Sequence, residues 1–299
     1  MKKRTTTVII ILMIVTGLSL LLYPTLSNYL RDLAFRRTIA QHTATAQRLD
    51  ETSLEEELSA ARAYNQRRAA KGGYMIILSE EERAEYSGLL DIDNTGVMGY
   101  VSVPKVNISL PIYHGTSDGA LQSGVGHLES SSLPVGGPST HAVLSAHTGL
   151  PTAKLFSNIN RLEEGDTFAV WTLGETLTYQ VDQIQVVPGS QMNTLRIEPG
   201  EDYCTLVTCT PYGVNSHRLL VRGHRVPTPS AAEALPDVED ETQRPGGAWW
   251  LPVTVTVLVL AAALAVLYRQ KSRKKRAKRP KEKETTIQNL RDPERPGAG

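Results

Sequence analysis

The sequence predicts a mainly-β fold, a closed barrel or a sandwich, with a helical extension before it and an apolar segment at each end of the chain. Three observations lead to this prediction. Short β-branched and aromatic runs, separated by turn residues, begin at Gly96. Residues 25–70 are rich in Ala, Leu, Arg, Glu and Gln and lack Gly, which favours helix. Residues 8–23 and 249–268 are almost wholly apolar.

The two apolar segments predict a chain that crosses the membrane twice. Val8–Tyr23 follows Lys2-Lys3-Arg4, and Trp249–Tyr268 precedes a basic tail. The second segment has the roughly 20 residues needed to span a bilayer. Since basic flanks stay inside, both termini are expected in the cytoplasm and the middle outside. A cleaved signal peptide is the alternative for the first segment, but no clear small-x-small cleavage site follows it, which favours an uncleaved anchor.

The charges divide along the same lines. Residues 25–248 hold 17 Lys and Arg against 27 Asp and Glu, a net charge of −10, whereas residues 269–299 hold 12 against 4, a net charge of +8. A basic tail can bind nucleic acid. Its position directly after a membrane-length segment instead favours an orientation signal with contacts to anionic lipid, so no nucleic-acid partner is expected.

The helical extension is expected to contain a second helix that begins near Ser53. Ser53-Leu54-Glu55-Glu56 resembles a capping box, and the helix should run towards Ala70 and end at Lys71-Gly72-Gly73. Residues 74–95 form a mixed linker, in which Glu80-Glu81-Glu82 predicts a solvated turn or a short helix.

The strands are predicted from short runs of β-forming residues. They cover Val97–Val103, Ile108–Tyr113, His141–Ser145, Phe168–Thr172, Leu177–Val187, Tyr203–Cys209 and Arg218–Arg225. Leu173-Gly174-Glu175 predicts a hairpin turn, and Leu155–Asn160 one short helix. Residues 226–248 are rich in Pro, Ala and acid, which is typical of a flexible linker.

Cys209 ends one predicted strand and is the candidate nucleophile. Turn residues Pro211, Gly213 and Asn215 follow it, and Arg218 opens the next strand. A hairpin would bring the thiol and the guanidinium together, and a thiol beside a positive charge can act as a thiolate nucleophile. The alternative is a buried cysteine that only packs, the usual fate of a free cysteine.

His147 is the candidate acid and base. It lies in Ser145-Ala146-His147 at the end of a short apolar strand, directly before Thr148-Gly149, whereas His141 should lie at the opposite end of that strand. Arg218 stays protonated and cannot serve as a base, but it can stabilise an oxyanion or hold the substrate backbone.

Cys204 is predicted to pack in the core. In one extended strand it would lie roughly 16 Å from Cys209 and point to the opposite face, too far for a disulfide. The two cysteines have no zinc-binding spacing, and the sequence has no phosphate-binding loop or dinucleotide fingerprint. Neither a metal nor a cofactor is therefore expected.

These motifs together resemble those of the sortases, cysteine transpeptidases of the Gram-positive cell surface. The resemblance rests on Thr205-Leu206-Val207-Thr208-Cys209 with Arg218 nine residues on, and on Ser145-Ala146-His147. The family usually has glycine where Ala146 stands. The blocks Gly124–Glu129, Leu133–Gly137 and Thr148–Pro151 are similar to class C, the pilus-assembling branch.

The resemblance implies a closed eight-stranded barrel with an N-terminal helical extension, and catalysis by His147, Cys209 and Arg218. It also implies an LPxTG-like sorting signal as substrate and a lysine amine of a pilin subunit as acceptor. Anchoring of surface proteins to a peptidoglycan amine is the alternative reaction. A non-catalytic, membrane-tethered β-barrel binding module is the alternative of another class.

Class C enzymes usually carry an Asp-Pro-aromatic lid, which Tyr74–Glu81 lacks. We therefore expect a more open active site than in lidded relatives. We expect His127 to be structural, His217 to point away from Arg218, and His224 to lie at the surface.

The predicted organisation has six parts. They are the anchor 1–24, the helical extension with the lid-region linker 25–95, the barrel 96–225, the linker 226–247, the C-terminal transmembrane helix 248–268 and the cytoplasmic tail 269–299.

Overall fold

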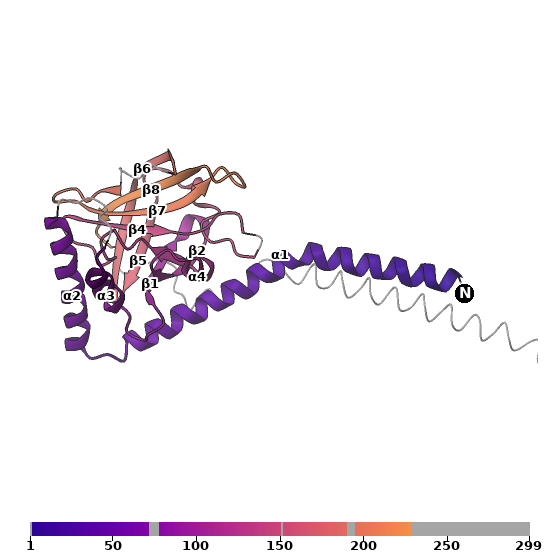
Figure 1. Cartoon of the computed structure of the whole chain (residues 1–299), viewed down its shortest axis with the longest axis horizontal. Coiled ribbons are helices and arrows are strands. Elements are labelled where there is room, and N and C mark those ends of the chain that lie inside the picture. Colours follow the sequence, from indigo (N-terminus) through magenta and orange to yellow (C-terminus); the bar gives the residue numbers. More distant parts are fainter. Residues whose placement is uncertain (1, 72–77, 151, 190–194, 229–299) are drawn as a thin grey trace, which may run out of the picture. The chain divides into compact units, whose positions relative to one another are not determined.

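A computed structural model of the chain describes residues 2–71, 78–150, 152–189 and 195–228 (Figure 1). The predicted C-terminal transmembrane helix, the basic tail, most of the linker 226–247 and residues 72–77 of the lid region lie outside these ranges. The described residues divide into two compact units, one that ends at Leu26 and one that begins at Ser27. The second unit holds the barrel and both helices that follow the anchor.

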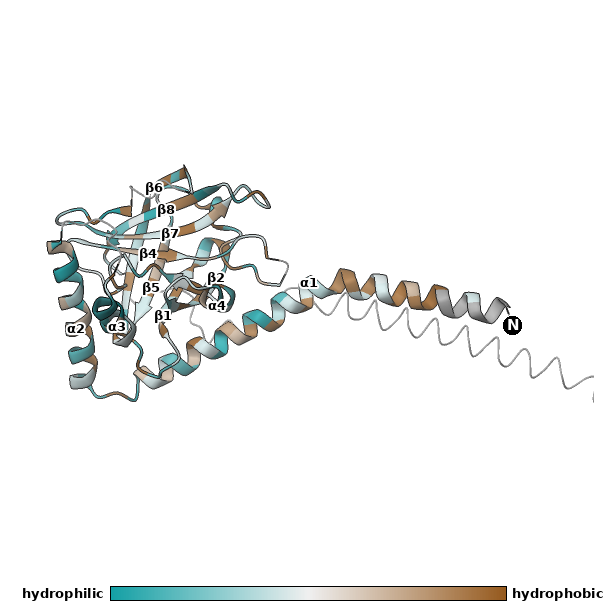
Figure 2. Ribbon diagram, in the orientation of Figure 1, coloured by the Kyte–Doolittle hydropathy of each residue, from teal (hydrophilic) through white to brown (hydrophobic). Residues whose placement is uncertain are grey.

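Helix α1 (Lys2–Ala46) runs through the predicted anchor without a break at its expected end near residue 24. The stretch of α1 from Ile10 to Tyr23 is largely apolar (Figure 2), and its large side chains are exposed, with Leu20 71% and Leu21 76% exposed. Exposed apolar surface of this length is unfavourable in water. Among the described residues, one helix near the N-terminus is long and apolar enough to cross a membrane.

The later part of α1 packs on the barrel. Phe35, Ile39, His42 and Ala46 recur at helical spacing and are all buried. The His42 ring meets Trp171 edge to face at 6.1 Å. The extension is therefore an integral layer of the second unit.

Two shorter helices follow, α2 (Glu51–Ala70) and α3 (Glu80–Gly88), and both lie beside the barrel (Figure 1). Helix α2 begins earlier than predicted, because Asp50 is its N-cap and accepts from the Ser53 backbone N–H at 2.8 Å. The expected capping box at Ser53 is thus wrong. A true capping box starts α3, where Ser79 and Glu82 bond to each other's backbone N–H groups, so the short-helix alternative for Glu80-Glu81-Glu82 is confirmed.

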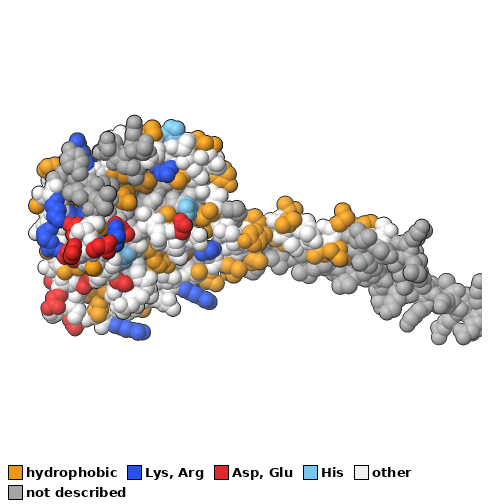
Figure 3. Space-filling view, viewed as in Figure 1, with side chains coloured by type: hydrophobic (Ala, Val, Ile, Leu, Met, Phe, Trp, Pro, Cys, Tyr) orange, Lys and Arg blue, Asp and Glu red, His pale blue; other side chains and the backbone are white. Residues whose placement is uncertain are grey.

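Charged side chains join α2, α3 and the barrel at one end of the molecule, where Figure 3 shows acidic and basic groups gathered. Arg67 pairs with Glu85 and Lys71 with Glu82, between the two helices. Arg83 of α3 reaches Glu129 of the barrel at 3.3 Å. These pairs are largely exposed, so each adds little to stability.

The remaining elements form a closed barrel in the order β1-β2-β3-β4-β7-β8-β6-β5. The strands are β1 (Val97–Val103), β2 (Ile108–His114), β3 (Val125–His127), β4 (Thr140–Ser145), β5 (Thr167–Thr172), β6 (Glu175–Pro188), β7 (Asp202–Thr210) and β8 (His217–Val226). Most pairs are antiparallel, but β2–β3 and β4–β7 are parallel. The closed eight-stranded barrel implied by the resemblance is confirmed.

All seven predicted strands are present, and the predicted turn at Leu173-Gly174-Glu175 joins β5 to β6. Two elements were not predicted from the sequence, β3, which is three residues long, and the short helix α4 (Asp118–Ser123). The expected helix at Leu155–Asn160 is wrong. Leu155 has a φ of 39°, and only a 3₁₀ turn at Ile159–Arg161 follows.

Candidate functional site

The thiol and the guanidinium proposed from the sequence lie opposite each other in the barrel wall. Strands β7 and β8 are antiparallel, and Cys209 is the direct register partner of Arg218. Facing residues of such a pair have Cβ atoms about 4.5–5.5 Å apart. The predicted hairpin is therefore confirmed as a juxtaposition of these two residues.

His147 reaches the same end of the sheet from β4, which runs parallel to β7. The last register pair is Ser145 with Val207. The alignment continues beyond it, because the Ala146 N–H donates to the Val207 carbonyl at 3.1 Å and the Thr208 hydroxyl donates to the Ala146 carbonyl at 2.8 Å. His147 therefore leaves β4 at the same end of the sheet at which Cys209 ends β7.

The three residues lie at the outer face of the barrel wall. Cys204 and Leu206 belong to the main core, whereas Val207 and Leu220 belong to a second apolar cluster outside it, with Val143. Since side chains alternate along a strand, Cys209 shares the face of Val207 and Arg218 that of Leu220. All three candidate residues are partly exposed, as a site open to a polypeptide requires.

Arg218 is held by the loop between β7 and β8. Its Nη1 donates to the Asn215 carbonyl at 3.0 Å and to the His217 carbonyl at 3.1 Å. The guanidinium also lies over Gly189, where an added Cβ would be 3.4 Å from Nη1. These contacts fix one side of the planar group, and its Nε and Nη2 groups make no hydrogen bond within the part of the chain that the structure describes.

Cys204 differs from Cys209 as the sequence predicts. It is fully buried and faces the main core, and burial raises the pKa of its thiol well above the ordinary value. A neutral, enclosed thiol is neither nucleophilic nor reachable.

The other histidines have structural surroundings. His127 is fully buried, and its Nδ1 accepts from the Tyr86 hydroxyl (3.0 Å) while Nε2 donates to the Ser132 carbonyl (2.7 Å), an assignment that satisfies the neutral ring. Burial lowers its pKa to about 3. The structural reading of His127 is confirmed. His224 is partly exposed on β8, at 41% of its side chain.

His141 lies at the opposite end of β4 from His147, as expected. Its Nδ1 donates to the Arg196 carbonyl (2.8 Å) and Nε2 accepts from the Thr205 hydroxyl (2.7 Å). Burial lowers its pKa to about 4. The bond to Arg196 connects the segment before β7 to β4. It was not predicted from the sequence, because no local sequence pattern indicates it.

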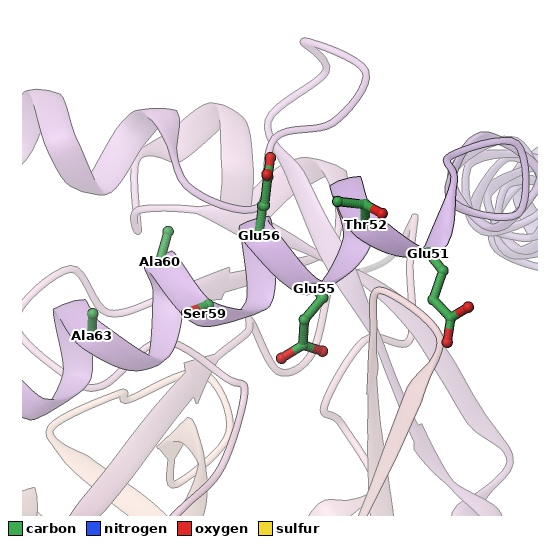
Figure 4. A pocket seen from close by; sticks show the side chains of 7 residues that line it. All are labelled: Glu51, Thr52, Glu55, Glu56, Ser59, Ala60 and Ala63. Carbon is green, nitrogen blue, oxygen red and sulfur yellow. The ribbon is translucent and has the colours of Figure 1, made fainter.

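A hollow of about 740 Å³ lies along α2, away from these residues (Figure 4). Its described lining comes from this one helix and includes Glu51, Glu55 and Glu56. A wall made by a single helix is open surface, and none of the three candidate residues lines it. Within the described residues, no group of three or more His, Cys, Asp or Glu side chains could hold a metal ion.

Known proteins match this chain most strongly over the barrel. The Sortase domain family matches residues 101–226. Sortase A of Streptococcus agalactiae serotype III (strain NEM316) is 30% identical over 120 residues, which cover 39% of this chain and 48% of that relative. The curated relatives are thus matched over 42% to 63% of their own length.

Solved structures match over a longer region. Sortase C1 from S. agalactiae superposes with a TM-score of 0.63 and 50% identity, covering 64% of this chain and 100% of that one. Sortase C of Streptococcus pneumoniae, described with regard to its pilin substrate specificity, gives a TM-score of 0.57 and 42% identity over 64% of this chain and 97% of that one.

Proposed function

Because this chain belongs to the sortase family, we propose that it is a membrane-anchored cysteine transpeptidase that polymerises pilins. It cleaves an LPxTG-like sorting signal and joins the new carboxyl end to a lysine amine of a pilin subunit. The observation that carries the proposal is the pairing of Cys209 with Arg218 at the strand end where His147 also arrives.

The proposed reaction begins with attack of the Cys209 thiolate on the scissile carbonyl carbon. A C–S bond forms, and the carbonyl oxygen takes up the negative charge, which the free N–H groups of Arg218 stabilise. His147 then gives a proton to the leaving nitrogen as the C–N bond breaks. The products of this half-reaction are a free amine and a thioester on Cys209.

The second half reverses these roles. A neutral lysine amine attacks the thioester carbon, and His147 accepts the proton that the new amide nitrogen releases. The C–S bond breaks and the electron pair returns to sulfur, which regenerates the thiolate. One amide bond is broken and one is made, so the reaction needs neither cofactor nor metal.

Pilin polymerisation is favoured over peptidoglycan anchoring by the likeness of this chain to solved structures of sortases C. The proposed topology places the barrel, residues 96–225, outside the cell. The segments 1–24 and 248–268 anchor it, and the tail 269–299 lies in the cytoplasm.

The direct test is acceptor choice by the full chain in detergent. An LPxTG peptide is offered together with a lysine-bearing pilin fragment and a peptidoglycan stem peptide, and products are read by mass spectrometry. The proposal predicts an amide bond to the pilin lysine. Product on the stem peptide alone would favour the anchoring reaction, and peptide binding without any cleavage would favour the binding module.

A further inference from the structure

The loop between β7 and β8 reaches across to the loop after β4 through Tyr212. The Tyr212 hydroxyl donates to the Gly149 carbonyl at 3.2 Å. Gly149 has a φ of +75°, and a Cβ there would lie 2.0 Å from Cε2 and 2.4 Å from Cδ2 of the Tyr212 ring. The ring therefore rests directly on the glycine Cα, and no larger residue fits beneath it.

Other contacts hold the same short segment from its remaining sides. The Phe156 N–H donates to the His147 carbonyl at 3.1 Å, and the Gly149 N–H donates to the Ser157 hydroxyl at 2.9 Å. On the side of β7, Thr208 binds the carbonyl of Ala146. Tyr212 supplies the last of these contacts, and it comes from the loop that joins Cys209 to Arg218.

Tyr212 is 73% exposed, so its burial contributes little to global stability. Its contacts instead connect two loops, one continuous with Cys209 and the other containing His147. We propose that Tyr212 is a positioning residue, whose clasp on Gly149 keeps His147 in line with Cys209. The inference rests on the proposed function, because it assigns the clasp to the proton-transfer step.

If the Tyr212 contact acts by positioning His147, its loss should lower kcat most for substrates whose leaving group must be protonated. An amide nitrogen needs protonation, whereas a phenolate leaves without it. Tyr212→Ala should lower kcat for an LPxTG amide about tenfold or more, with KM changed less than about twofold. For an aryl ester with the same acyl group, the loss should stay below about threefold.

Three further variants test whether the loss of kcat comes from the contact of the Tyr212 ring with Gly149. Tyr212→Phe keeps the ring on Gly149 and should lose less than Tyr212→Ala. Val214→Ala is the matched control, because Val214 lies in the same loop and is 69% exposed. Gly149→Ala should displace the ring and lower kcat. Gly149→Ala should lower kcat by a smaller factor when Tyr212 is already alanine, so the effects of the two substitutions should not be additive.

Hydrogen exchange of the full chain tests the clasp without turnover. Tyr212→Ala should speed amide exchange in the peptide holding residues 147–150 at least threefold, with an unchanged melting temperature, while Val214→Ala should not. If the wild type transfers neither amide nor ester acyl groups, the proposed function fails, and faster exchange still supports the clasp. Equal losses on amide and ester, or unchanged exchange in Tyr212→Ala, would overturn the inference.

Discussion

At the scale of single residues, the two thiols of this chain show how position sets reactivity. Cys204 and Cys209 lie on one strand, five residues apart. Cys204 is enclosed by the core, and burial raises its thiol pKa, whereas Cys209 reaches the outer face opposite a guanidinium. Cys209 is therefore the thiol that a substrate can reach, and Cys204 is not.

The planar shape of Arg218 should matter as well as its charge. Arg218→Lys keeps a cation but loses the donors that bind the loop carbonyls and a developing oxyanion together. We expect turnover to fall by about 10² or more, as for loss of an oxyanion-hole donor.

Arg222→Lys is the matched control on the same strand. Arg222 lies on the same face of β8, four residues further along the strand from Arg218, and binds Asp182 with two bonds of 3.0 and 2.9 Å, so turnover should change little. Steady-state kinetics on purified variants of equal melting temperature make the comparison. Near-normal turnover of Arg218→Lys would show that Arg218 supplies only a general positive charge or has a structural role.

The sequence predicted the Cys209–Arg218 pair from local signals alone, since turn residues between two apolar runs indicate a hairpin. His147 is different. Its approach to Cys209 depends on a parallel pairing of β4 with β7, about 60 residues apart in the chain, and no periodicity encodes that partner choice. Only the family resemblance placed the two together. The Tyr212–Gly149 contact was missed for the same reason.

At the scale of elements, the start of α2 depends on a single side chain. Asp50 caps the helix, whereas Ser53 contributes only its backbone N–H to that cap. Asp50→Ala should therefore lower the melting temperature by a few degrees, while Ser53→Ala should have little effect. Circular dichroism melts of the two variants decide between the caps. A larger loss in Ser53→Ala would restore the capping box first expected there.

Element prediction failed where strands were too short or turns too tight. Val125–His127 forms only three residues of strand between glycine-rich and polar segments, so no alternation can be seen. Leu155–Asn160 was expected to be helical, yet Leu155 adopts a positive φ and the Phe156 N–H donates to the His147 carbonyl. At both places tertiary contacts, and not a local sequence preference, determine the structure.

At the scale of the whole molecule, buried neutral histidines make the barrel sensitive to acid. His127 and His141 have folded pKa values of about 3 and about 4, well below the ordinary 6.5, because burial disfavours the charged ring. The unfolded chain therefore binds more protons in this range, and stability must fall as pH drops from about 6.5 towards 4.

The expected loss between pH 7 and pH 5 is on the order of 2 kcal/mol for each buried histidine. Urea unfolding at the two pH values measures it. His141→Gln keeps one donor and one acceptor and should remove part of the pH dependence, whereas His224→Gln, at a partly exposed position, should leave it. An equal free energy of unfolding at pH 7 and pH 5 would show that protonation of His127 and His141 does not destabilise the fold.

The central claim is that Cys209 carries the acyl group, and the most direct measurement is the mass of the trapped intermediate. The full chain in detergent is incubated with an LPxTG peptide without acceptor amine, quenched in acid and mapped by mass spectrometry. Wild type and Cys204→Ala should carry the peptide as a thioester on Cys209, and Cys209→Ala should carry none and form no product. Acylation or transpeptidation that persists in Cys209→Ala would contradict the account.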